Sequence, residues 1–103
     1  MAGEEQAPEK GRQRLDKWLF FTRLVKSRAL AQKRIADGDI ALNGQIVTQA
    51  SQTVRMGDRL SLASWHGIQR RILTIIVLAP GDRRGPFEEA RLLYDVVGTT
   101  EEG

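Results

Sequence analysis

The residues of this chain that are best suited to bind another molecule are basic, and they crowd into one short stretch. Residues 12–34 contain eight lysines and arginines, opposed only by Asp16. Such a segment repels itself unless an anion lies near, and the phosphates of a nucleic acid are anions of this kind. A solvated helical face has the same composition, because lysine and arginine are common at protein surfaces. The neighbouring residues must decide between the two interpretations.

Three features of the sequence favour binding. Lys26, Ser27 and Arg28 stand at the predicted start of a helix, where free backbone N–H groups attract anions. Arginine forks can grip phosphate oxygens in pairs. The Asn43-Gly44 turn offers an amide and an open backbone to a sugar or a base. The residues expected to contact nucleic acid on these grounds are Arg14, Lys17, Arg23, Lys26, Ser27, Arg28, Lys33, Arg34, Asn43 and Gln45.

A second, peripheral basic set is a weaker candidate. It consists of Arg70, Arg71, Arg83 and Arg84. Solvated surface is the slightly favoured interpretation of these four arginines.

Catalysis is not expected. The chain has no cysteine and a single histidine, His66, which excludes a thiol nucleophile and any site built from several histidines or cysteines. The carboxylates are scattered singly, so no acid–base pair is evident. The glycines mark separate turns and form no phosphate-binding loop. We therefore expect a protein that is not an enzyme and has no metal and no cofactor.

The length and charge of the chain indicate what kind of domain carries these residues. A chain of 103 residues holds one domain, and an apolar share of 41% is typical of a globular one. The net charge of +3 conceals an asymmetry, since residues 10–84 carry 15 bases against five acids and both ends are acidic. The sequence shows neither a signal peptide nor an apolar run long enough to span a membrane. A cytoplasmic, monomeric protein without a membrane partner is expected.

Two short helices should carry most of the basic residues. Apolar residues recur with helical spacing in residues 14–24, and the predicted buried stripe is Leu15, Trp18, Leu19, Thr22 and Val25. Ser27 is a suitable N-cap for a second helix over residues 28–37, and Gly38 is suited to end it. The inward residues of the second helix are Ala31, Ile35 and Ala36. Trp18 is expected in the core, Phe20 is expected to pack rather than stack on a base, and Trp65 is left unassigned.

After Gly38 the pattern is that of strands. Asn43-Gly44 between alternating segments predicts a hairpin with a type I′ turn. Strands are predicted over residues 59–63 and 68–78, a loop over 80–86 and a closing helix over 87–97. The expected fold is α+β, with two short N-terminal helices packed on a small, mostly antiparallel sheet and a C-terminal helix. Residues 1–11 are expected to be a disordered lead-in, 12–97 a single domain and 98–103 a frayed tail.

These residues together resemble a known RNA-binding family. The motif includes Arg14-Leu15-Asp16-Lys17-Trp18-Leu19, Lys26-Ser27-Arg28-Ala29, Gly38, Asn43-Gly44 and Gly57-Asp58. It is similar to the αL RNA-binding motif of the ribosomal protein S-four-like domain, over residues 12–63. Arg83-Arg84, Glu89-Ala90 and Leu92-Leu93-Tyr94-Asp95 also resemble the bacterial fifteen-kilodalton ribosome-associated heat-shock protein family.

The resemblance implies a protein that binds ribosomal RNA of the large subunit, with tRNA as a further candidate partner. It also implies a role in the rescue of stalled subunits that carry peptidyl-tRNA under stress. It places Arg14, Lys17, Arg23, Lys26, Ser27, Arg28 and Asn43 at matched motif positions. Members of that family continue into a long basic tail, whereas this sequence ends at Gly103, so contacts made by such a tail are not expected. An adaptor for structured RNA or DNA in general is the alternative, and a fragment of an RNA-modifying enzyme is the third hypothesis.

Overall fold

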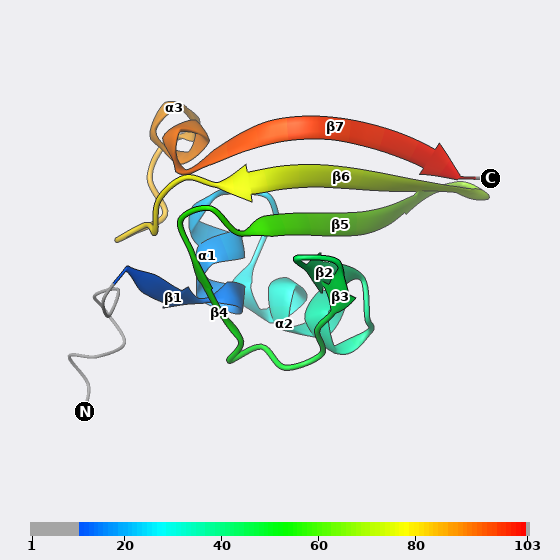
Figure 1. The fold of residues 1–103 in the computed structure, drawn as a ribbon, viewed down its shortest axis with the longest axis horizontal. Helices are drawn as coiled ribbons and strands as arrows, with labels where there is room; N and C mark the ends of the chain where they lie inside the picture. Colours follow the sequence, from blue (N-terminus) through cyan, green and yellow to red (C-terminus); the bar gives the residue numbers. More distant parts are fainter. Residues whose placement is uncertain (1–10, 103) are drawn as a thin grey trace.

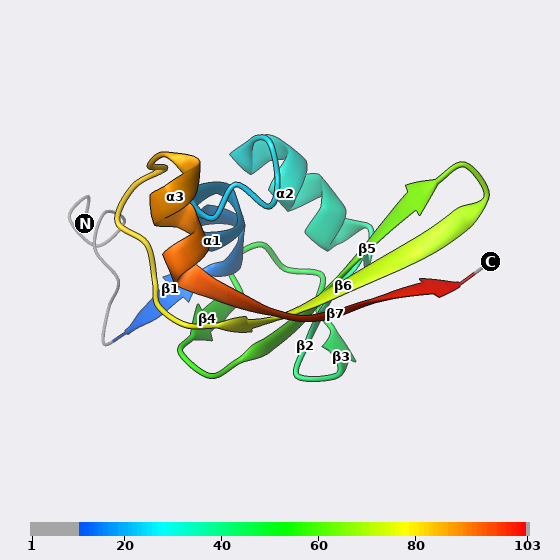
Figure 2. The same ribbon diagram turned by 90° about the horizontal axis from the view of Figure 1, so that it is seen from above.

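A computed structural model describes residues 11–102 of the chain. Most of the expected lead-in, residues 1–10, and the last residue, Gly103, lie outside the described residues. Helices α1 (Leu15–Phe21) and α2 (Arg28–Ala36) lie on one side of a five-stranded sheet, and a two-stranded sheet lies beside α1 (Figures 1 and 2). The α+β fold expected from the sequence is confirmed.

The five-stranded sheet is antiparallel throughout, in the order β3-β2-β5-β6-β7. Its strands are β2 (Ile40–Leu42), β3 (Gln45–Ile46), β5 (Arg59–His66), β6 (Gln69–Val77) and β7 (Tyr94–Glu102). The predicted hairpin turn is confirmed, because Asn43 and Gly44 both have positive φ, 51° and 89°. The β5–β6 hairpin extends beyond the helices at one end of the molecule (Figure 2).

The second sheet pairs two segments that are distant in the chain. Strand β1 (Arg12–Arg14) is antiparallel to β4 (Thr53–Arg55). The backbone N–H of Leu15 then donates to the carbonyl of Gln52 at 2.7 Å. These bonds hold the start of α1 against the segment that leads into β4.

The closing helix predicted over residues 87–97 is wrong for most of its length. Helix α3 covers only Phe87–Ala90, and a 3-10 turn, η2 (Arg91–Leu93), follows it. Tyr94 is extended, with φ −150°, and the chain continues as β7 along β6. Val96 and Val97 favour a strand because their branched side chains restrict helix formation. Residues 98–102, expected to be frayed, belong to the same strand.

The helices match their predicted stripe closely. All five residues of the α1 stripe are buried, and the Trp18 indole donates to the carbonyl of Ala79 at 2.9 Å. Helix α1 ends at Phe21, three residues earlier than predicted, because Arg23 adopts a left-handed conformation with φ 63°. In α2, Ala31 and Ile35 are buried as predicted, whereas Ala36 is exposed. The core thus lies between the two helices and the sheet.

Candidate nucleic-acid interface

A buried carboxylate organises the basic surface. Asp16, in the first turn of α1, is fully buried. Its oxygens accept hydrogen bonds from Arg14 Nε at 3.1 Å, Arg28 Nε at 3.3 Å and Gln32 Nε2 at 2.9 Å. These partners come from the end of β1 and from α2. Asp16 therefore joins three elements and holds two arginines beside each other.

The environment of Asp16 stabilises its charged form. Burial alone would raise the pKa of its carboxyl group. The hydrogen bonds from Gln32 and Arg14 and the charges of Arg28 and Arg14 outweigh this effect and hold the pKa below its ordinary value. The carboxylate is thus ionised at neutral pH and attracts both guanidinium groups.

The two arginines keep part of their surface in solvent. The side chain of Arg14 is 40% exposed and that of Arg28 is 36% exposed. The bond from Arg28 uses Nε, and its terminal N–H groups have no acceptor within residues 11–102, so they can donate to another molecule. A guanidinium that is fixed at one edge loses little further freedom when it grips a phosphate. Sequence reasoning treated Asp16 only as the acid opposing the basic residues and as a motif position, and it missed Gln32.

The start of α2 adds to this cluster. Ser27 is the N-cap as predicted, because its Oγ accepts a hydrogen bond from Leu30 N at 3.0 Å. No acidic residue lies in the first turn of α2. Lys26 is exposed directly before the cap, and Lys17 Nζ lies 5.8 Å from the centre of the Phe21 ring. We call Arg14, Lys17, Lys26, Ser27 and Arg28 the helix-pair surface.

Three further predicted binding residues are engaged elsewhere in the fold. Arg23 Nε donates to the carbonyl of Gly85 at 2.6 Å, and Arg34 donates to the carbonyl of Ala63. Lys33 pairs with Asp37 at 2.7 Å, and this hydrogen bond raises the pKa of the lysine. These contacts tie the helices to a loop, to the sheet and to the end of α2. The structure does not bring them into the Asp16 cluster.

The predicted hairpin residues also lie apart from that cluster. Asn43 Oδ1 accepts from Arg59 N at 2.9 Å, and Asn43 Nδ2 donates to Asp58 Oδ1 at 3.2 Å. The side chain of Asn43 thus closes its own turn against the start of β5. Gln45 is exposed on β3.

The peripheral arginines are largely paired within the protein. Arg71 pairs with Glu101 at 2.8 Å and Arg83 with Glu89 at 2.9 Å. The Arg84 guanidinium lies 4.8 Å from the centre of the Phe20 ring, so Phe20 packs against this side chain. Arg70 stands opposite Trp65 in the β5–β6 register, and Trp65 is 64% exposed.

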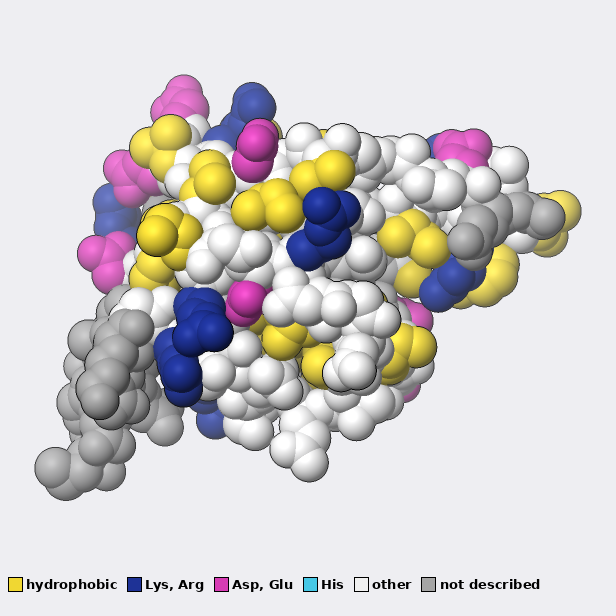
Figure 3. All heavy atoms as spheres, viewed as in Figure 1, with side chains coloured by type: hydrophobic (Ala, Val, Ile, Leu, Met, Phe, Trp, Pro, Cys, Tyr) yellow, Lys and Arg dark blue, Asp and Glu magenta, His cyan; other side chains and the backbone are white. Residues whose placement is uncertain are grey.

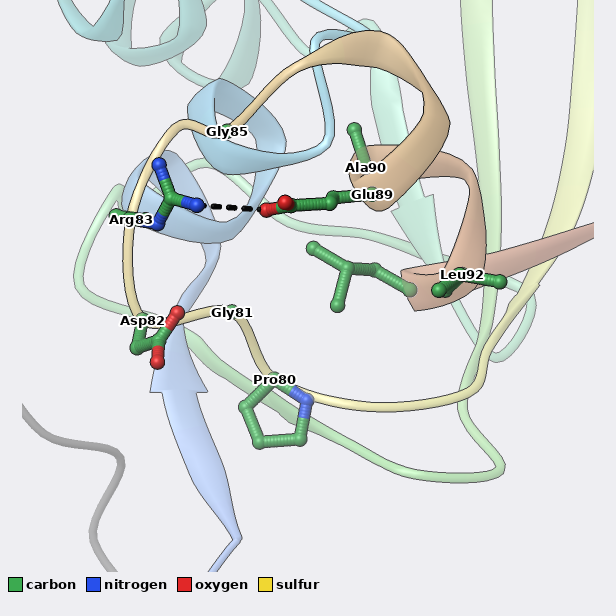
Figure 4. Close-up of a pocket in the computed structure, with 9 residues that line it drawn as sticks. Pro80, Gly81, Asp82, Arg83, Gly85, Glu89, Ala90 and Leu92 are labelled. Carbon is green, nitrogen blue, oxygen red and sulfur yellow. Dashed lines mark hydrogen bonds and ion pairs between the residues drawn. The ribbon is translucent and has the colours of Figure 1, made fainter.

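A cavity of about 400 Å³ lies between the loop of residues 80–86 and α3 (Figure 4). Arg83 and Glu89 form their ion pair across it, and Asp82 also lines it. The cavity has no excess of positive charge for a nucleic acid. No group of three acidic or histidine side chains suited to a metal occurs within residues 11–102, and none of the helices described there could cross a membrane.

Comparison with known proteins shows the family to which this chain belongs. The S4 domain family model matches residues 13–60. Heat shock protein 15 of Escherichia coli is 42% identical over 82 residues, which cover 80% of this chain and 58% of that protein. A structure described as trimeric Vibrio cholerae heat shock protein 15 is 34% identical, with a TM-score of 0.74, and the match covers 84% of this chain and 82% of that one. This chain belongs to the heat shock protein 15 family.

The family assignment confirms the resemblance seen in the motif. A homolog of heat shock protein 15 from Haemophilus influenzae is 37% identical over 81 residues. The chain spans 58% of the length of these curated relatives. The S4 domain match covers α1, α2, β2, β3 and β4, and so includes the whole helix-pair surface.

Proposed function

We propose that this chain binds structured RNA through the helix-pair surface. The observation that carries the proposal is the Asp16 cluster, which fixes Arg14 and Arg28 beside each other at the start of α2. Two partly exposed guanidinium groups, with Lys26 and the free N–H groups of α2 nearby, form a site for consecutive phosphates. Membership in the heat shock protein 15 family and the S4 domain match support RNA as the ligand.

We further propose that the RNA is ribosomal RNA of the large subunit in the cytoplasm. The family resemblance supports this target, and it supports a role in the rescue of stalled subunits that carry peptidyl-tRNA. Recognition would depend on the shape of the RNA backbone more than on base sequence, because the surface offers cations and backbone N–H groups.

Sedimentation tests the ribosomal target. Extract from unstressed and heat-stressed cells is run through a low-salt gradient, and the protein is located by antibody. We expect it in the large-subunit fractions. A protein that stays at the top of the gradient under both conditions would contradict the ribosomal target. Crosslinking followed by mapping of the RNA then identifies the site.

Arg28→Ala tests the surface itself. The variant should bind RNA more weakly, and the salt dependence of log K should become shallower by about 0.7–0.9 for each lost phosphate contact. Arg91→Ala is the matched control, because Arg91 lies in η2 against the Phe87 ring, outside the helix-pair surface. An unchanged salt slope in Arg28→Ala would mean that this arginine does not contact phosphate.

A general adaptor for structured RNA or DNA is the second candidate, because phosphate contacts alone carry no sequence information. Competition between ribosomal RNA, unrelated RNA hairpins and duplex DNA separates the two functions. Equal affinities would favour the adaptor. The Vibrio cholerae relative is described as trimeric, whereas the sequence predicts a monomer here. Light scattering with and without RNA measures whether the free protein and the RNA-bound protein are monomers or trimers.

A further inference from the structure

Two arginines that sequence reasoning did not select face each other across the small sheet. Arg12 in β1 and Arg55 in β4 are direct partners in the antiparallel register. Directly opposite residues in such a pair have side chains only about 5 Å apart at their base, so two like charges there are unfavourable. Both side chains are exposed. The pair therefore opposes the formation of the small sheet that holds α1 in place.

Neither arginine has a carboxylate partner among residues 11–102. Other arginines within these residues do pair with an acid, namely Arg14, Arg28, Arg71 and Arg83. Asp58 lies near Arg55, but its Oδ2 accepts from the backbone N of Arg55 at 3.0 Å and its Oδ1 from Asn43. The Asp58 carboxylate thus accepts hydrogen bonds within the turn and does not pair with a guanidinium group.

The two arginines line a groove of about 240 Å³. Its other polar walls come from Asn43, Gln52, Thr53 and Asp58. Two cations against one carboxylate leave the groove with an excess of positive charge, and hydroxyl and amide groups surround it. In Figure 3, drawn in the same view as Figure 1, Lys and Arg side chains gather beside the grey segment, in the region where Figure 1 draws β1 and β4.

The groove is continuous with the helix-pair surface along β1. Arg12 and Arg14 are two residues apart and lie on the same face of the strand, whereas Gln13 between them is buried on the other face. Two residues of strand span about 6.6 Å. One nucleic-acid backbone can therefore pass from Arg14 to the groove without leaving the protein surface.

We propose that Arg12 and Arg55 form a clamp for a phosphate of the RNA backbone, beyond the helix-pair surface. This inference rests on the proposed function, since it assigns a second contact of the same RNA. The bound phosphate lies between the two guanidinium groups and removes their repulsion. The small sheet is thereby more stable in the complex than in the free protein.

Arg55→Gln tests the clamp through two measurements, RNA affinity and the unfolding temperature of the free protein. RNA affinity should fall, and the salt slope of log K should become shallower by about 0.7–0.9 for one lost phosphate contact. The free variant should unfold at the same temperature as the parent protein or at a higher one, because a repulsion is removed. Arg91→Gln is the charge-matched control and should leave the salt slope unchanged.

The outcomes separate this proposal from the proposed function. If the parent protein binds no structured RNA, the proposed function fails and the clamp fails with it. If the parent protein binds RNA and Arg28→Ala weakens binding, but Arg55→Gln keeps the parental slope and affinity, only the clamp is overturned. Inorganic phosphate is the last probe. If it raises the unfolding temperature of the parent protein but not of Arg55→Gln, while the RNA slopes are equal, the groove binds a free anion and the clamp is again overturned.

Discussion

The side-chain amide of Gln13 makes two hydrogen bonds with the backbone of Gly81, 68 residues further along the chain. Nε2 donates to the Gly81 carbonyl at 2.7 Å, and the Gly81 N–H donates to Oε1 at 3.0 Å. A Cβ at residue 81 would lie 3.0 Å from Leu93 and 3.1 Å from Phe21, so these neighbours would have to move by a few tenths of an ångström to accept a side chain. The pair thus fixes the loop after β6 against β1.

Gln13→Met should destabilise the protein by about 2–6 kcal/mol, because the buried N–H and C=O of Gly81 lose their partners and each costs about 1–3 kcal/mol. Urea unfolding followed by circular dichroism measures the change. Gln52→Met is the control, since Gln52 is half-buried and its amide makes only a 3.3 Å bond to the carbonyl of the next residue. Equal losses in both variants would contradict a special role for Gln13.

Asp16→Asn should lower the free energy of unfolding by about 1.5–3 kcal/mol at pH 7, because charge-assisted hydrogen bonds to Arg14 and Arg28 are lost. RNA affinity should also fall, since the two arginines are no longer fixed. The stability difference between parent and variant should shrink in acid. The pKa of Asp16 is lower in the folded than in the unfolded chain, so the carboxylate stabilises the fold above the unfolded pKa, about 4, and the stabilisation is lost as the pH falls through the folded pKa.

Measuring urea midpoints from pH 7 to pH 2 tests this coupling. Asp58→Asn is a useful comparison, because Asp58 accepts hydrogen bonds in a turn rather than between helices. A difference between Asp16→Asn and the parent that stays constant down to pH 2 would contradict the assignment.

Trp18→Phe should cost about 1–3 kcal/mol, because the Ala79 carbonyl loses the indole donor and the smaller ring leaves a void in the core. The chain has two tryptophans, and Trp65 is mostly exposed. Trp65→Phe should therefore leave the urea midpoint nearly unchanged. The emission of that variant comes from Trp18 alone and reports burial directly. A solvent-like emission maximum would contradict the core position of Trp18.

Two substitutions of Ser27 should separate its effect on stability from its effect on RNA binding. Ser27→Ala removes the N-cap of α2 and should cost about 1 kcal/mol. Ser27→Asp keeps a capping oxygen and should retain most of the stability, but its negative charge beside Arg28 should repel RNA. Thermal unfolding and RNA titration of both variants give the two quantities. Parental RNA affinity in Ser27→Asp would mean that no phosphate approaches this cap.

Asn43→Ala should destabilise the hairpin by about 1–2 kcal/mol, the approximate cost of a left-handed conformation for a residue with a Cβ and no local hydrogen bond. The variant also loses the bonds to Arg59 and Asp58. Gln45→Ala, two residues away and exposed, should change stability little. Loss of RNA binding in Asn43→Ala with unchanged stability would favour direct contact over the structural role.

Local signals in the sequence were sufficient for most of the fold. The stripe of α1, the cap at Ser27 and the Asn43-Gly44 turn each depend on a few adjacent residues, and all three are confirmed. Residues 94–102 could not be predicted in this way. The helix prediction for residues 87–97 gave too little weight to the strand propensity of Val96 and Val97. The pairing of residues 94–102 with β6 is a tertiary contact, which a periodicity within one segment does not contain.

The candidate interface was predictable in composition but not in connectivity. The sequence shows which residues carry charge, whereas the distinction between Arg28 and Arg34 depends on what each side chain contacts. Arg28 donates to the buried carboxylate of Asp16, whereas Arg34 donates to the carbonyl of Ala63. The Arg12–Arg55 opposition arises from pairing across 43 positions of chain, which no local pattern reveals.

Helix α1 has only seven residues, and isolated helices shorter than about 12–15 residues are marginal in water. Its first turn is held by Gln52 and Ala50, and its buried stripe by the sheet. These bonds accompany the pairing of β1 with β4, so α1 is held in place by contacts that close a long loop of chain. We expect a peptide of residues 12–37 to carry all the charge of the helix-pair surface without its fixed arrangement, because β4 and the sheet that hold α1 lie outside the peptide.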